Sequence, residues 1–185
     1  MNEENKTHRL IQRITRNAFL LALLCVVGMF SIPLGEHIKV SLQLWVVFLI
    51  CFLAEGFLDC LLITGCYLLL GLFLPIYAGF SFGISPTFGF VISFVVASPL
   101  IYFLNRYIPL PKIAKMAIAS LAGLLIVYAI GSLFMCLYLE WSYPATLMVA
   151  VVPYLPFDAI KIVLAILTML ALPEAVKPEA GKKSE

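Results

Sequence analysis

The sequence predicts an all-α membrane protein whose chain crosses the bilayer six times. Three observations support this fold class. Of its 185 residues, 63% are hydrophobic and only 12% are charged, whereas about 25% of the residues in a soluble domain are charged. The apolar residues form separate runs close to the length of about 20 residues that a membrane helix needs. The charged residues gather between these runs and at the two ends of the chain.

The apolar segments cover residues 17–33, 40–53, 57–74, 87–104, 116–139 and 145–172. The first follows a basic stretch, as in a signal peptide, but no small-residue cleavage pattern comes after it, so we expect a retained helix. The second is short, so it should be tilted, shielded by neighbours or extended past Glu55. The last is interrupted by Pro153 and Pro156, which predicts a short helix, a turn and a second helix from about Phe157 to Leu172.

The basic residues divide the chain into three regions and predict its orientation. Residues 1–16 form a basic arm, residues 17–172 a six-helix membrane domain and residues 173–185 a tail. Six crossings place both ends and the connection after the fourth segment on one side, where lysine and arginine gather. Lys39 is the one basic residue in the connections on the other side, so the positive-inside rule predicts a multi-pass protein of the cell membrane with both termini cytoplasmic. The basic residues on the cytoplasmic side are Lys6, Arg9, Arg13, Arg16, Arg106, Lys112, Lys115, Lys177, Lys182 and Lys183.

Asp158 and Lys161 are the candidate functional pair. They are the only charges between Glu140 and Glu174, and each costs roughly 2.5–3.5 kcal/mol at a bilayer centre. Being three residues apart, they share one helix face and can converge on one ligand. Asp158 also falls near the start of the predicted helix, at its outward mouth, where the helix dipole favours an anion. The pair predicts a binding site, with a self-neutralising pair that lets the helix insert as the alternative.

Several other classes of function lack their sequence signals. The chain has no phosphate-binding loop and no hydrolase or zinc-protease motif, and its net charge of +2 gives no sign of nucleic-acid binding. Its five cysteines show no metal-ligand spacing, so we expect no metal and no cofactor. An intramembrane enzyme that uses Asp158 and Lys161 as acid and base remains an alternative, although no nucleophile accompanies them.

Two further patterns concern contacts. Ala18 and Ala22 form a small-residue stripe that another helix can approach closely, with packing inside the bundle as the alternative. The same alternatives apply to Ala119 and Gly123. The connection over residues 75–86 is apolar, aromatic and interrupted by glycine and proline, which favours a lid or wall over an apolar ligand rather than a helix-dimer motif.

A set of short motifs resembles the BioY family, the biotin-specific substrate-binding components of energy-coupling-factor transporters. The resemblance covers about residues 18–172. The chain departs from the family pattern at Phe157, where glycine is frequent, and at Phe88, where the family commonly has a first of two glycines. The motifs are Val40-Ser-Leu-Gln43, Tyr67-Leu-Leu-Leu-Gly71, Pro75-Ile-Tyr-Ala-Gly79, Ser85-Pro86-Thr87, Tyr128-Ala-Ile-Gly131 and Pro153-Tyr-Leu-Pro156-Phe-Asp158-Ala-Ile-Lys161.

Membership implies a non-enzymatic subunit that binds biotin from outside and works with a transmembrane coupling protein and two cytoplasmic ATPases. In this superfamily an AxxxA motif contacts the coupling protein, and Ala18 and Ala22 match it. Asp158 is then expected to accept from the ureido N–H groups of biotin, and Lys161 to donate to its ureido oxygen or its carboxylate. A capture component for another small vitamin is the nearest alternative. The remaining candidate binding residues are Gln43, Tyr77, Gly79, Phe80, Ser85, Tyr128 and Tyr143.

Overall fold

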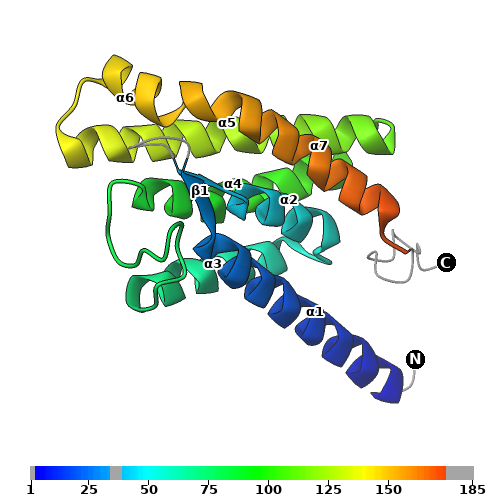
Figure 1. Cartoon of the computed structure of the whole chain (residues 1–185). Helices are drawn as coiled ribbons and strands as arrows, with labels where there is room; N and C mark the ends of the chain where they lie inside the picture. Colours follow the sequence, from blue (N-terminus) through cyan, green and yellow to red (C-terminus); the bar gives the residue numbers. More distant parts are fainter. Residues whose placement is uncertain (1–2, 34–38, 174–185) are drawn as a thin grey trace.

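The computed structural model describes residues 3–33 and 39–173, and its membrane domain is helical (Figure 1). The predicted fold is confirmed: six segments cross the molecule, and the sixth is divided at the two prolines. The tail beyond Pro173, with its three lysines, lies outside the described residues. The elements in chain order are α1 (Glu3–Met29), α2 (Gln43–Leu53), α3 (Phe57–Phe73), α4 (Phe88–Tyr107), α5 (Lys112–Leu139), α6 (Tyr143–Ala150), the 3-10 turn η1 (Val152–Tyr154) and α7 (Leu155–Ala171).

Four helical segments are long and apolar enough to cross a membrane, and two are shorter. The long ones are Thr7–Met29, Phe88–Tyr107, Lys112–Leu139 and Tyr143–Ala171. Of the short ones, α2 has 11 residues and a length of about 16 Å at 1.5 Å per residue. Ten of its residues are buried, so the predicted shielding by neighbours is confirmed, and the helix ends before Glu55.

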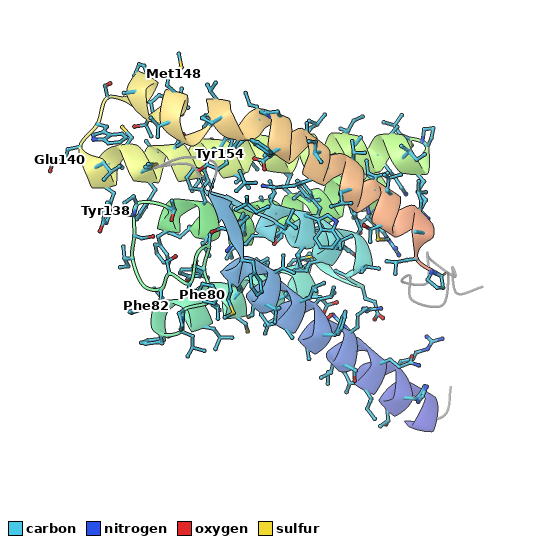
Figure 2. All side chains as sticks on the ribbon, viewed as in Figure 1. Phe80, Phe82, Tyr138, Glu140, Met148 and Tyr154 are labelled. Atoms are coloured by element: carbon cyan, nitrogen blue, oxygen red, sulfur yellow. The ribbon has the colours of Figure 1, made fainter. Side chains whose placement is uncertain are left out.

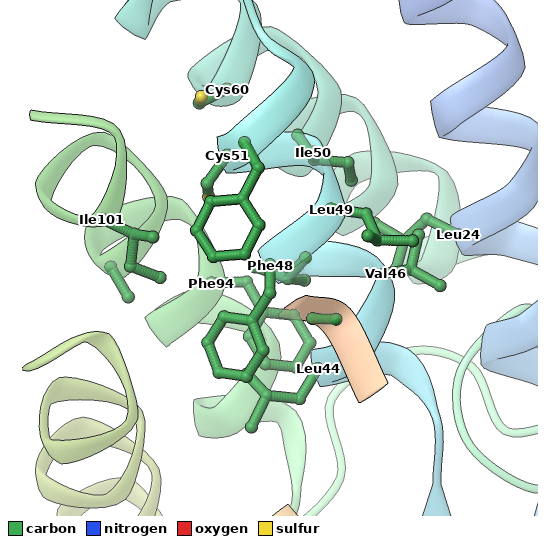
Figure 3. Close-up of a cluster of buried hydrophobic side chains, with 14 of the residues drawn as sticks. Leu24, Leu44, Val46, Phe48, Leu49, Ile50, Cys51, Cys60, Phe94 and Ile101 are labelled. Atoms are coloured by element: carbon green, nitrogen blue, oxygen red, sulfur yellow. The ribbon is translucent and has the colours of Figure 1, made fainter. Parts of the chain in front are cut away.

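The core of the bundle surrounds α2. This helix packs against α1, α3, α4 and α7, and its side chains are apolar on every face after Gln43, as expected of a fully buried helix. Figure 3 shows Phe48 of α2 beside Phe94 of α4, with Leu24 of α1 on another side of the same helix. All three side chains are almost fully buried.

Glycines allow α4 and α5 to pack closely. A side chain at Gly123 of α5 would meet Ile101, and one at Gly131 would meet the ring of Phe90, both on α4. Ala119 is fully buried on the same helix. Ala119 and Gly123 therefore serve packing within the bundle, which was one of the two interpretations of that pair.

The first helix is longer than predicted. It begins at Glu3 rather than near residue 17, so the described part of the predicted basic arm is a helical extension of the first span. Its inner face carries Leu20 and Leu24, which are almost fully buried, whereas Ala18 and Ala22 are exposed. The small-residue stripe therefore faces away from the bundle.

A short hairpin joins α1 to α2. Strand β1 (Ser31–Pro33) pairs antiparallel with β2 (Lys39–Ser41), with Ile32 opposite Val40. The sequence does not predict these strands. Three residues per strand are too few to show an alternating pattern.

The two ends of the bundle differ in character. The start of α1, the α4–α5 connection and the end of α7 all lie on the right side of Figure 1. We call this side the basic end, because Arg106 and Lys112 flank the α4–α5 connection. The connection over residues 74–87 and the α5–α6 turn lie at the opposite end, the loop end. Figure 2 shows Phe80, Phe82 and Tyr138 there. Helices α2 and α7 both start on the loop-end side and run in the same direction.

Candidate ligand-binding site

Asp158 and Lys161 lie together inside the bundle, as the spacing predicted. The Lys161 ammonium donates to Oδ1 of Asp158 at 2.6 Å. Both residues are buried, with 4% and 6% of their surface exposed. Two charges in such a place need hydrogen-bonding partners, because burial of an unpaired ion is costly.

The break in the sixth segment positions this pair. Helix α6 ends at Ala150, η1 contains Pro153, and α7 begins at Leu155 with Pro156 in its first turn. Proline suits that turn because its missing N–H has no helical partner there. Asp158 lies in the same turn, close to the unpaired N–H groups at the positive end of the helix dipole. The helix starts two residues earlier than predicted.

Tyr128 of α5 completes the cluster. Its hydroxyl donates to Oδ2 of Asp158 at 2.6 Å, so the two carboxylate oxygens have different partners. Tyr128 lies 11 residues before Leu139, about 16 Å from the end of α5 at 1.5 Å per residue. Asp158 therefore lies in the first turn of α7, as predicted, but inside the bundle, because α6 and η1 precede this turn in the sixth segment.

The pair retains hydrogen-bonding capacity. A carboxylate has about four acceptor positions, and Asp158 uses two of them, for Tyr128 and Lys161. An ammonium has three donors, and Lys161 uses one of them, for Asp158. A self-neutralising pair would make the same contact between Asp158 and Lys161. The distance between Asp158 and Lys161 therefore fits both a ligand-binding site and a self-neutralising pair. Ligand binding by variants with either residue substituted separates the two.

Tyr143 lies toward the loop end of this cluster. It is the first residue of α6 and is partly exposed, and its hydroxyl accepts from Ser132 Oγ at 3.2 Å. Ser132 is four residues after Tyr128 on α5, so both face the same side of that helix. A polar path of Tyr143, Ser132 and Tyr128 therefore follows α5 inward from the loop end.

Gln43 is buried and links several elements of the bundle. Its side-chain nitrogen donates to the Tyr67 hydroxyl at 2.6 Å and lies 3.4 Å from the carbonyl oxygen of Gly28. The Tyr67 hydroxyl in turn donates to the carbonyl of Ile76 at 3.0 Å. This chain of contacts joins α2 to α1, α3 and the connection over residues 74–87. Within the described part of the chain, Gln43 and Asp158 have separate hydrogen-bond partners.

Tyr77 is directed into the bundle. Its ring lies over Gly71 and contacts the rings of Tyr67 and Phe88, and its hydroxyl donates to the carbonyl of Leu68 at 2.6 Å. Burial raises the pKa of Tyr77 to about 12, so the hydroxyl keeps its proton and its donor role at neutral pH. Its observed contacts are those of a packing residue.

The connection over residues 74–87 is anchored to two helices. The N–H groups of Gly79 and Phe80 donate to the carbonyl of Met29 on α1, and the N–H of Gly83 donates to Gly71 on α3. Gly79 and Gly83 have φ of +72°, which glycine adopts without strain, so neither belongs to a helix-dimer motif. Of the two original interpretations, a wall fits these contacts better than a lid.

Two other candidates lie in this connection. Phe80 is more than half exposed and meets the edge of Phe30, so it does not line the Asp158 cluster. Ser85 is placed before α4, where its hydroxyl lies 3.2 Å from that of Thr87 and its carbonyl accepts from the N–H of Phe88. Ser85 therefore helps to start the helix.

Two residues have roles that the sequence does not predict. Tyr67, which belongs to one of the family motifs, is fully buried and links Gln43 to Ile76. The indole N–H of Trp45 on α2 is buried and has no hydrogen-bond partner within the described part of the chain. A tryptophan in an apolar segment is usually a packing residue, so neither composition nor spacing marked it.

Comparisons with known proteins identify the family and support the fold. A sequence profile of the BioY family matches residues 1–178. The biotin transporter BioY of Thermotoga maritima is 29% identical over 166 residues, which cover 88% of this chain and 96% of that protein. A crystal structure of the S-component for biotin from an ECF-type ABC transporter shares the fold with a TM-score of 0.78, at 22% identity and over 91% of this chain and 92% of that one. Because the family profile spans almost the whole chain, this multi-pass membrane protein belongs to the BioY family.

Proposed function

We propose that this chain is the biotin-binding subunit, or S component, of an energy-coupling-factor transporter. It captures biotin and is not an enzyme. The observation that carries the proposal is the buried cluster of Asp158, Lys161 and Tyr128 in a chain of the BioY family. The relative from Thermotoga maritima is named a biotin transporter, and the similar solved structure is a biotin S-component.

The cluster matches the polar part of biotin. The ureido group offers two N–H donors and one carbonyl acceptor. Asp158 accepts from the N–H groups with its remaining lone pairs, and Lys161 donates to the ureido oxygen or to the carboxylate of the side chain. Charge-assisted hydrogen bonds of this kind are roughly twice as strong as neutral ones. The apolar core beside α7 suits the thioether ring.

Other side chains support entry and orientation. Biotin enters from the loop end along Tyr143, Ser132 and Tyr128. Trp45 lies in the first turn of α2, a helix that packs against α7, and its unpaired buried N–H is available to a ligand. Gln43 acts through Tyr67 to hold the wall formed by residues 74–87, with Gly79 and Ser85 shaping its backbone.

Two substitutions test the binding site. Asp158→Asn and Lys161→Met should each weaken biotin binding at least roughly 30-fold, because truncating one partner of a buried charge pair costs about 2–5 kcal/mol. Equilibrium binding of labelled biotin to the purified protein measures the effect, with gel filtration and thermal melting as folding controls. If both variants fold and retain the original affinity, Asp158 and Lys161 are not ligand contacts.

The identity of the ligand has a direct test. Mass spectrometry of the small molecule that co-purifies with the detergent-solubilised protein should detect unaltered biotin. Another vitamin in its place would reassign the substrate and leave the capture role intact. A chemically altered product would revive the enzyme alternative.

Transport requires a coupling protein and two cytoplasmic ATPases, and α1 supplies the docking face. Ala18 and Ala22 are exposed on α1, where a partner helix can approach closely. Placing the basic end in the cytoplasm, with both termini, brings this stripe to the same half of the membrane as the ATPases.

Bulky substitutions test the docking face. Ala18→Trp together with Ala22→Trp should leave biotin binding unchanged and abolish ATP-dependent uptake in cells that contain the full transporter. The physical reason is that two indole rings separate the helix backbones. The matched control is Leu125→Trp, at an exposed position of α5. Normal uptake by the double variant would refute docking at this stripe.

A further inference from the structure

Asp59, at the start of α3, is a second buried carboxylate with no part in the proposed ligand site. Only 2% of its surface is exposed. Arg13 Nε lies 2.9 Å from Oδ1 and 3.0 Å from Oδ2, Asn17 Nδ2 donates to Oδ1 at 2.8 Å, and the N–H of Gly56 donates to Oδ2 at 3.1 Å. We call Arg13, Asn17 and Asp59 the α1 latch. It joins the first helix to the start of the third.

The neighbouring acid makes a much weaker connection. Arg16 Nη2 lies 2.7 Å from Glu55 Oε1, but the Glu55 side chain is 42% exposed. A solvated pair of this kind typically contributes ~0–1 kcal/mol. Glu55 and Asp59 therefore have the same charge and lie near the same turn, but only Asp59 is buried and bonded to two side chains of α1.

The latch lies on the inner face of α1. Arg13 and Asn17 are followed on this face by the buried Leu20 and Leu24, at spacings of three and four residues. With 3.6 residues per turn, Ala18 and Ala22 fall on roughly the opposite face, and both are exposed. A rotation of α1 about its own axis would move the small-residue stripe toward the bundle.

Few other contacts oppose such a rotation in this half of the helix. Every side chain from Thr7 to Gln12 is exposed. The apolar side chains of this half, including Ile11 and Ile14, are more than half exposed. Hydrogen bonds to a buried charge are directional and strong. They therefore fix the rotation of α1 about its axis, which scattered apolar contacts would not fix.

We propose that Asp59 is a positioning residue for partner docking: by holding Arg13 and Asn17 it fixes the rotation and tilt of α1 and so presents Ala18 and Ala22 to the coupling protein. This inference rests on the proposed docking role of α1. Asp59 itself does not contact the partner or the vitamin. Its effect passes through the orientation of one helix.

The test measures that orientation in the isolated protein. Nitroxide labels at Ile11→Cys on α1 and Ile113→Cys on α5, both exposed positions, report the distance between these helices. The background replaces the partly or fully exposed Cys25, Cys66 and Cys136, and keeps the buried Cys51 and Cys60. Dipolar spectroscopy on this protein should give one narrow distance distribution.

Asp59→Asn should broaden and shift this distribution, and Arg13→Gln should cause the same change. The double variant should add little to either, because both substitutions break one connection. Glu55→Gln is the matched control and should leave the distribution unchanged. In the full transporter, Asp59→Asn should lower uptake about tenfold, equal to ~1.4 kcal/mol, while biotin affinity of the isolated protein stays within about twofold.

The outcomes separate this inference from the proposed function. An unchanged distance distribution in Asp59→Asn overturns the latch, whatever happens to uptake. Equal broadening in Glu55→Gln overturns the specific role of Asp59. If the unsubstituted protein fails to bind biotin, the proposed function falls, but the spin-label distances still decide whether the latch orients α1. If Asp59→Asn does not fold, Arg13→Gln provides the same measurement from the half-exposed partner.

Discussion

Two buried carboxylates in this molecule differ in how fully the protein occupies their acceptor positions. Asp59 receives four hydrogen-bonding contacts from Arg13, Asn17 and Gly56. Asp158 receives two, from Tyr128 and Lys161. A carboxylate has about four acceptor positions, so Asp59 is saturated and Asp158 is not. This difference supports a structural role for the first acid and a ligand-binding role for the second.

The Tyr128 hydroxyl has a separable contribution. Tyr128→Phe keeps the ring but removes a donor to a charged acceptor, which is typically worth ~1.5–3 kcal/mol, so biotin affinity should fall roughly tenfold to a hundredfold. Titration calorimetry on the purified variant measures the change. Tyr138→Phe, at a largely exposed tyrosine of the same helix, is the control and should bind normally. Equal affinities in the two variants would show that the Tyr128 hydroxyl is dispensable.

The sequence could predict the charged pair but not the roles of its uncharged neighbours. Asp158 and Lys161 were conspicuous because charges are costly in an apolar segment. Gln43 and Tyr77 could not be assigned, because their partners are Tyr67, Gly28 and the Leu68 carbonyl, brought close by tertiary packing. The ion pair between Asp59 and Arg13 joins residues that are 46 positions apart, so no local sequence pattern predicts it.

Among the elements, α3 supports the wall at the loop end. Gly71 leaves room for the Tyr77 ring, and its carbonyl accepts from the N–H of Gly83. Six residues earlier on the same helix, Gly65 has no atom within 4 Å of where its Cβ would lie. The two glycines therefore form a natural comparison between a packed position and an open one.

Gly71→Ala should loosen the wall. The added methyl group overlaps the Tyr77 ring, and overpacking of this kind typically costs about 1–3 kcal/mol. We expect a lower melting temperature and faster dissociation of biotin. Gly65→Ala should show neither effect, because its methyl group meets nothing. A chase with unlabelled biotin measures dissociation, and identical rates in the two variants would contradict an anchoring role for Gly71.

Element boundaries were predictable where hydrophobicity changes and not elsewhere. The break at Pro153 and Pro156 was recognised because proline interrupts helix hydrogen bonding. The extension of α1 back to Glu3 was missed because residues 3–16 are too polar to read as a membrane segment. The strands β1 and β2 depend on a pairing between segments that have no alternation of their own.

At the scale of the whole molecule, the distribution of basic residues predicts sidedness. Lys112 lies at the basic end and Phe82 at the loop end, and both side chains are exposed. Each can be replaced by cysteine as a labelling site. In intact cells, a membrane-impermeant maleimide should label Phe82→Cys and leave Lys112→Cys unlabelled until the membrane is permeabilised. The positive-inside rule is the physical basis. The opposite labelling pattern would reverse the proposed orientation of the transporter.

The short, completely enclosed α2 has a consequence for how the protein is made. A helix of about 16 Å cannot cross ~30 Å of hydrocarbon, and lipid would cover few of its side chains. The acids Glu55 and Asp59 follow it directly and oppose entry of the turn into the bilayer. Arg13 and Arg16, synthesised earlier, supply the opposite charges. During biogenesis, we therefore expect α2 to enter the bilayer together with neighbouring helices, and these neighbours rather than the lipid to hold it there.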